Sequence, residues 1–137
     1  MGLVLDSSVL IAGERRRESV RDILDRVRQS FAEAEASLSV ITVAELTHGI
    51  HRAKTEADRQ RREAFVEELL HSLVVYPITL EIAQLAGRIE GQQAVHGISI
   101  AFPDLLIGVT ALHLGYSVAT LNVRHFQAIP GLSVVQI

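Results

Sequence analysis

Three acidic side chains stand where an α/β chain could bring them together. Asp6 ends the apolar run at residues 3–5, Glu45 opens one expected helix, and Asp104 opens another. Carboxylates that lie within a few ångströms of one another repel, and some of them take up protons unless a cation neutralises them. All-oxygen ligand sets select Mg²⁺ or Mn²⁺. The three positions therefore predict a divalent-metal site, which is suited to the hydrolysis of phosphodiester bonds.

Strand and helix signals alternate along the chain without a linker. Short apolar runs predict strands at residues 2–5, 37–41, 73–78, 118–121 and 132–137. Helical patterns fill the intervals between them, and residues 42–45 match a capping box that would start a helix running to about Arg52. This alternation predicts an α/β fold in three layers, in which helices flank a central, mostly parallel sheet of four to five strands. At 137 residues, we expect a single domain over 1–137.

The expected sheet explains how the acids would meet. Ligands bind outside the carboxyl ends of the strands in open parallel sheets. Asp6 and Asn122 both follow a strand, so they are expected at one rim, beside the amino ends of the helices that carry Glu45 and Asp104. Purely structural roles stay open for each acid alone: a turn residue, a capping-box partner and a helix-dipole residue. A shared metal accounts for all three at once.

Composition narrows the class of protein. The absence of cysteine excludes disulfides and thiolate zinc sites, and it agrees with a cytoplasmic location. No basic, apolar leader is seen, so we expect no secretion signal. The uncharged stretch at 105–123 is expected to be a buried helix followed by a strand, and not a membrane span. We expect His113 and His125 to be buried, hydrogen-bonded residues.

Basic residues are concentrated in the first half of the chain. The net charge is −3, yet only two of the 13 Lys and Arg residues lie beyond residue 63. Arg15, Arg16 and Arg17 are close in sequence to Asp6 and are candidates for binding the phosphates of a nucleic acid. A second basic group spans residues 52–62, where i,i+4 ion pairs on a solvated helix are the alternative.

Four short motifs occur in a fixed order. They are Asp-Ser-Ser-Val-Leu-Ile at 6–11, Thr-Val-Ala-Glu-Leu at 42–46, Pro-Asp-Leu-Leu-Ile-Gly at 103–108 and Thr-Leu-Asn-Val-Arg-His-Phe at 120–126. Together they resemble the motifs of PIN-domain ribonucleases of the VapC toxin type, and the resemblance covers nearly the whole chain. It implies a PIN-like fold, a Mg²⁺- or Mn²⁺-dependent endoribonuclease, a cognate VapB-type antitoxin as partner and a homodimer.

The resemblance also implies roles for individual residues. Asp6, Glu45 and Asp104 match the metal-binding acids of the family, whereas Asn122 stands where many members have a fourth acid. Ser8 and Thr120 match small hydroxyl residues that support the site. Because Asn122 carries no charge, the chain leaves open whether a second metal is bound.

Two alternatives remain at this point. A VapC-like scaffold with Asn122 in place of an acid could bind RNA or an antitoxin without catalysis. Alternatively, Glu45 with His48 and Glu68 with His71 are two Glu-x-x-His pairs, which di-iron helix bundles use. The predicted strands argue against the bundle, and the three acids argue against loss of catalysis.

Overall fold

The computed structural model describes residues 1–137 and contains one parallel sheet of five strands. The strands are β1 (Gly2–Leu5), β2 (Glu35–Ser39), β3 (Val74–Tyr76), β4 (Ser117–Thr120) and β5 (Ser133–Gln136). Their order is β3-β2-β1-β4-β5, and every pairing is parallel. The predicted sheet is therefore confirmed. Its chain order reverses between β1 and β4, and such a switch point is where open sheets bind ligands.

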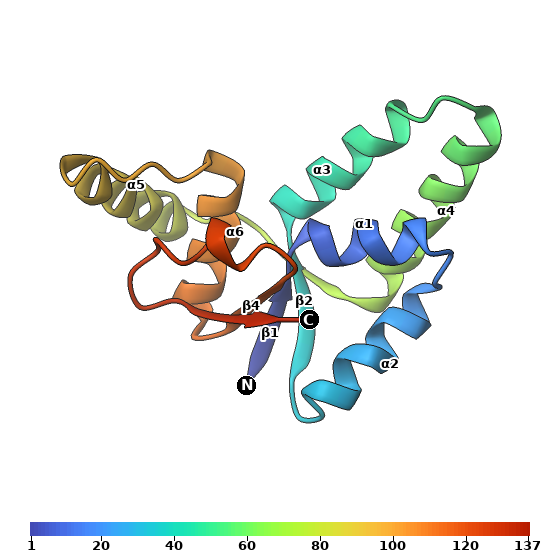
Figure 1. Cartoon of the computed structure of the whole chain (residues 1–137), viewed down its shortest axis with the longest axis horizontal. Coiled ribbons are helices and arrows are strands. Elements are labelled where there is room, and N and C mark those ends of the chain that lie inside the picture. Colours follow the sequence, from blue (N-terminus) through green and yellow to red (C-terminus); the bar gives the residue numbers. More distant parts are fainter.

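Six α-helices cover the two faces of the sheet. They are α1 (Ser7–Arg15), α2 (Val20–Ser30), α3 (Val40–His51), α4 (Glu56–Ser72), α5 (Leu80–Val95) and α6 (Phe102–Leu114), and a 3₁₀ turn, η1 (Val123–His125), follows β4. In Figure 1, α1 to α4 gather on one side of the strands, and α5 and α6 on the other. The result is the predicted three-layer arrangement.

The side chains on the two faces of the central strand, β1, belong to two separate hydrophobic cores. Leu3 and Leu5 pack with α1 to α4, whereas Val4 packs with α5 and α6, and all three side chains are fully buried. Successive side chains of a strand point to opposite faces, so a strand covered on both sides is apolar throughout. This is why residues 3–5 form an unbroken apolar run that stops at Asp6.

Helix α3 begins earlier than the sequence suggests. Its N-cap is Ser39, whose Oγ accepts a 3.1 Å hydrogen bond from the Ile41 amide. The capping box expected at residues 42–45 is therefore wrong, and Thr42 is a fully buried residue inside the helix. Glu45 lies in the second turn, so a capping role does not explain it.

Two other features of the fold bear on the alternatives. No helix here has both the length and the apolar character needed to cross a lipid bilayer. The apolar stretch at 105–123 is divided between α6 and β4 by Gly115, whose φ of +72° ends the helix. The five-stranded sheet also excludes a di-iron helix bundle.

Candidate metal centre

Asp6 lies at the switch point, where β1 ends beside β4. Its amide donates a 2.9 Å hydrogen bond to the Ala119 carbonyl, which fixes the backbone at the rim of the sheet. Asp6 occupies the N-cap position of α1, but its side chain makes no capping hydrogen bond. The residue is 3% exposed, and its carboxylate turns instead toward two hydroxyl groups. A role as helix cap therefore does not explain this acid.

The two hydroxyls belong to Ser8 and Thr120. Ser8 Oγ donates to Asp6 Oδ2 at 2.8 Å, and Thr120 Oγ1 donates to the same oxygen at 2.9 Å. Each hydroxyl also accepts a backbone amide, Leu121 N at 3.1 Å and Asn122 N at 2.9 Å. A hydroxyl that accepts an amide keeps its one proton for the carboxylate. The network fixes Oδ2, while Oδ1 receives no hydrogen bond from the protein and can face a cation.

Glu45 presents an unsatisfied buried oxygen. Its Oε1 is inaccessible to solvent and has no hydrogen-bond partner. Burial raises the pKa of the Glu45 carboxyl above its ordinary value of 4.5, and the nearby Ser7 hydroxyl acts in the opposite direction. The charges of Asp6 and Asp104 raise that pKa further. Leaving a buried carboxylate oxygen unpaired is costly, so the site favours a proton or a cation there.

Asp104 completes the group of acids from the first turn of α6. Burial raises the pKa of its carboxyl above the ordinary 3.8, and the negative charge of Asp6 raises it as well. His125 acts in the opposite direction, with its Nδ1 at 3.3 Å from Asp104 Oδ2. The three acids therefore lie close enough to perturb one another.

His125 is the site residue that sequence reasoning missed. We expected it to be buried, but its side chain is 56% exposed, and His113 is also exposed. Its position three residues after Asn122, on the turn η1 that follows β4, brings it to the rim. The short distance in sequence between His125 and Asn122 is the one feature of the sequence that indicates a place for His125 at the site.

The three acids do not form a complete set of metal ligands around one point. No three acidic or histidine side chains already surround one point as closely as a metal ion requires. Asn122 joins the site through its backbone amide, and its exposed side chain makes no hydrogen bond within the protein. Ionised carboxylates repel one another, so a cation between them would allow a closer approach.

The basic triplet expected to bind RNA divides into three different environments. Arg15 has no ion pair and lines a cavity that Glu45 also lines. Arg16 forms an ion pair with Glu18 at 2.7 Å. Arg17 is exposed, in a left-handed backbone conformation with φ of +63°. Of the three, Arg15 is the one that shares a cavity with a site acid, Glu45.

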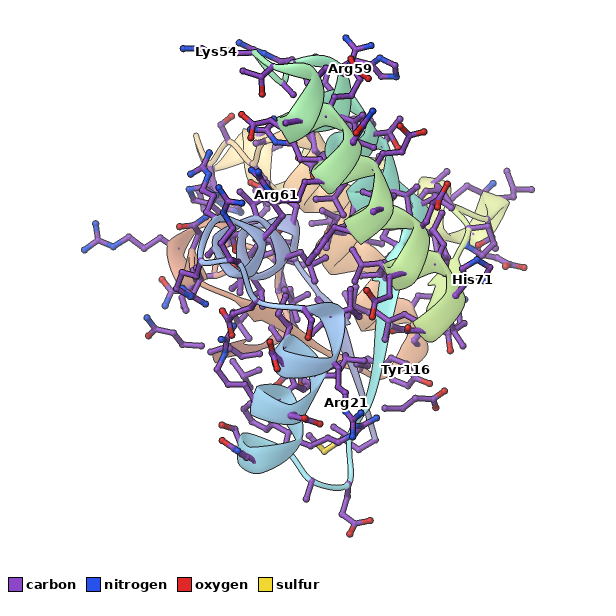
Figure 2. The ribbon with its side chains drawn as sticks, turned by 90° about the vertical axis from the view of Figure 1, so that its right-hand side faces the viewer. Arg21, Lys54, Arg59, Arg61, His71 and Tyr116 are labelled. Carbon is purple, nitrogen blue, oxygen red and sulfur yellow. The ribbon has the colours of Figure 1, made fainter.

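The second basic group also divides. Arg61 pairs with Glu14 at 3.0 Å and with Asp58 at 2.8 Å, which ties α4 to α1. Arg62 donates to the Gly49 carbonyl of α3 at 2.7 Å. In Figure 2, Lys54 and Arg59 lie at one end of the molecule, away from Arg61. The arginines nearest the acids therefore have structural contacts, which explains part of this group without RNA.

Comparison with known proteins gives the family. The model of the PIN domain matches residues 3–132. Ribonuclease VapC1 of Rickettsia felis is 34% identical over 137 residues, which cover 100% of this chain and 97% of that protein. The VapBC2 structure from Rickettsia felis, bound to a promoter DNA fragment, superposes with a TM-score of 0.86 at 18% identity, over 100% of this chain and 99% of that chain. VapBC-1 from nontypeable Haemophilus influenzae gives a TM-score of 0.82 at 26% identity, over 99% and 98%. The chain belongs to the PIN-domain family and, within it, to the VapC ribonucleases.

Proposed function

We propose that this protein is a metal-dependent endoribonuclease toxin that hydrolyses RNA at a Mg²⁺ or Mn²⁺ ion held by Asp6, Glu45 and Asp104. The observation that carries the proposal is the buried, unpaired Oε1 of Glu45, in the field of two further acids. A divalent cation would neutralise this charge and satisfy the orphaned oxygen. The donor set is all oxygen, which suits these ions.

When bound, the ion would lower the pKa of a water molecule and polarise a phosphoryl oxygen. The residues of the chain do the positioning. Ser8 and Thr120 hold Asp6, and His125 places its Nδ1 3.3 Å from Asp104 Oδ2. In-line attack by water would leave a 5′-phosphate and a 3′-hydroxyl. No side-chain nucleophile is needed, so the chemistry rests on orientation and charge.

The partner is proposed to be a VapB-type antitoxin. This proposal rests on family membership and on the similarity to VapBC-1 from Haemophilus influenzae, which is a complex of that kind. The antitoxin would have to cover the rim of the sheet to stop cleavage. Mixing the protein with its antitoxin should therefore suppress both metal uptake and RNA cleavage.

A homodimer is proposed through α5 and the start of α6. Helix α5 exposes the small residues Ala83, Gly87, Gly91 and Ala94. A Cβ built at Gly87 or Gly91 meets nothing within 4 Å. Val95 and Phe102 nearby are 82% and 63% exposed, which is unusual for large apolar side chains and favours a covered face. Sedimentation of the purified protein tests this, and a monomer at micromolar concentration would contradict it.

Cleavage of RNA with and without metal tests the main proposal. Purified protein should cut single-stranded RNA in Mg²⁺ or Mn²⁺, stop in excess chelator, and recover when the ion is restored. Analysis of the product ends should give 5′-phosphates. Undiminished cleavage in chelator would contradict a metal mechanism. Tight RNA binding without cleavage in any divalent ion would instead establish the non-catalytic alternative.

A further inference from the structure

A small cavity adjoins the proposed metal centre. It measures about 120 Å³ and lies between α1, α3 and α4. Its apolar walls are Leu10, Ile11, Leu46, Phe65 and Val66. Glu45 forms part of the same wall, so the cavity begins where the group of acids ends.

We infer that this cavity receives one pyrimidine base of the RNA, from a nucleotide adjoining the scissile phosphate. The inference rests on the proposed ribonuclease function and adds a subsite that selects the base. Size supports it. An apolar cavity of about 150 Å³ in another protein takes up benzene, so about 120 Å³ suits one six-membered ring and is small for the two fused rings of a purine.

Charge at the cavity also favours a nucleotide. Arg15 lines it without an ion pair, and Arg62 has no carboxylate partner, since its one hydrogen bond goes to the Gly49 carbonyl. The remaining acid apart from Glu45 is Glu14, which Arg61 already neutralises at 3.0 Å. The hydrogen bond from Arg61 lowers the pKa of the Asp58 carboxyl most, and Arg62 lies close enough for its charge to lower that pKa further. Arg15 is therefore the guanidinium left to face the backbone phosphates and the carbonyl oxygens of a base.

Position connects the cavity to cleavage. A side chain that would bind the metal also forms the cavity wall, so a base in the cavity and a phosphate at the metal belong to neighbouring parts of one strand. Proteins commonly grip single-stranded RNA by stacking a splayed-out base on an aromatic side chain, and Phe65 supplies an aromatic ring in this wall. Filling the cavity should therefore alter which RNA is cut and leave the metal in place.

Gly49 allows the cavity to be filled from within. It lines the cavity on α3, and a Cβ built there meets nothing within 4 Å. Gly49→Leu replaces a helical glycine by a strong helix former, so the fold should persist. Gly49→Ala is the milder version and should give a partial effect. Thr47→Leu, exposed on the same helix and outside the cavity, is the matched control.

The experiment combines these variants with RNA oligonucleotides that lack one base at a time on either side of the cut. Wild type and Thr47→Leu should prefer a pyrimidine at one position, and they should lose about tenfold in kcat/KM when that base is removed. Gly49→Leu should cut the complete RNA about tenfold more slowly and show no further loss with the abasic RNA. Mn²⁺ affinity should be equal in all three proteins.

The outcomes separate the possible failures. An equal abasic penalty in wild type and Gly49→Leu overturns the inference, as does the lack of any base preference in wild type. Should wild type cut no RNA, the proposed function fails, and the same oligonucleotides in a binding assay still decide whether a base enters the cavity. If Gly49→Leu changes only the affinity for an antitoxin peptide, the cavity belongs to the antitoxin and the inference is wrong.

Discussion

The Thr120 hydroxyl donates a 2.9 Å hydrogen bond to Asp6 Oδ2, which joins residues 114 positions apart in sequence. The contact exists because β4 lies next to β1, so the carboxyl ends of both strands reach the same rim. It fixes one carboxylate oxygen and leaves the other without a hydrogen bond from the protein. Orientation of a metal ligand by such a neighbour commonly changes metal affinity by about 10- to 100-fold.

Thr120→Val should therefore weaken Mn²⁺ binding by about tenfold or more. The change also deprives the Asn122 amide of its acceptor, which should cost about 0.5–1.5 kcal/mol of unfolding free energy, because Asn122 is exposed to water. Calorimetry and denaturant unfolding measure the two effects. Thr110→Val is the control, because that buried hydroxyl donates to the Leu106 carbonyl away from the site. Equal Mn²⁺ affinity in Thr120→Val and wild type would remove Thr120 from the site.

Stability of the metal-free protein should fall as pH rises. Glu45 and Asp104 have raised pKa values, so the folded protein holds their protons above the ordinary values of 4.5 and 3.8. Unfolding in that interval releases protons, and the free energy of unfolding therefore decreases with pH until the folded carboxyls have ionised. Melts in chelator at graded pH should show this slope, and Glu45→Gln should flatten it. A slope unchanged by Glu45→Gln would contradict the assignment.

Asp104→Ala should abolish RNA cleavage and cellular toxicity while the fold persists. Removing a single donor that stabilises transition-state charge costs about 10²–10³ in rate, and we expect loss of a metal-binding carboxylate to cost at least as much. The metal-free variant should melt no lower than wild type, because one of three mutually repelling carboxylates is gone. Cleavage at the wild-type rate, or failure to fold, would show that the role is wrong.

Arginine substitutions should differ along the triplet. Arg15→Gln should weaken RNA binding and reduce its salt dependence by about one ion, since each phosphate contact releases counterions. Arg16→Gln should have a smaller effect, because Arg16 is already paired with Glu18. Binding isotherms at several salt concentrations compare the two. Equal salt dependence of RNA binding in both variants would show that Arg15 is a solvated surface residue and does not contact a phosphate.

Asn122→Asp adds a carboxylate to the rim. It should tighten Mn²⁺ binding and lower the stability of the metal-free protein, because like charges accumulate. Melting temperatures with and without Mn²⁺ should differ more in the variant than in wild type, since a ligand stabilises the state that it binds. Identical shifts would place position 122 beyond the reach of the metal.

The sequence predicts the centre of the sheet well because β1 and β4 are buried on both faces. An apolar run such as residues 3–5 has few other roles, and the polar residue that ends it marks the rim. The start of α3 could not be read in the same way, because Ser39 and Thr42 are both able to cap a helix. Which of the two residues caps the helix depends on where β2 stops pairing with β1. The last pair is Val4 with Ser37, and this pairing is a tertiary contact that the local sequence does not show.

The contacts between side chains of the site could not be predicted from the sequence either. His125 follows Asn122 closely, but its proximity to Asp104 depends on how η1 turns toward α6. The sequence also does not show how each acidic side chain is rotated. The acids lie at one rim of the sheet, but they do not surround a single point as metal ligands do. The residue types predict that the carboxylates lie at one edge of the sheet. The distances between their oxygens depend on side-chain packing and on the bound ion.

Anomalous diffraction from a crystal soaked in Mn²⁺ tests the central claim most directly. We predict one strong peak among Asp6, Glu45 and Asp104, with carboxylate oxygens at about 2.0–2.2 Å, as expected for a small hard cation. The side chain of Glu45 should turn its unpaired oxygen to the ion. A peak elsewhere, or no peak in a crystal whose dissolved protein cleaves RNA in chelator, would contradict the account.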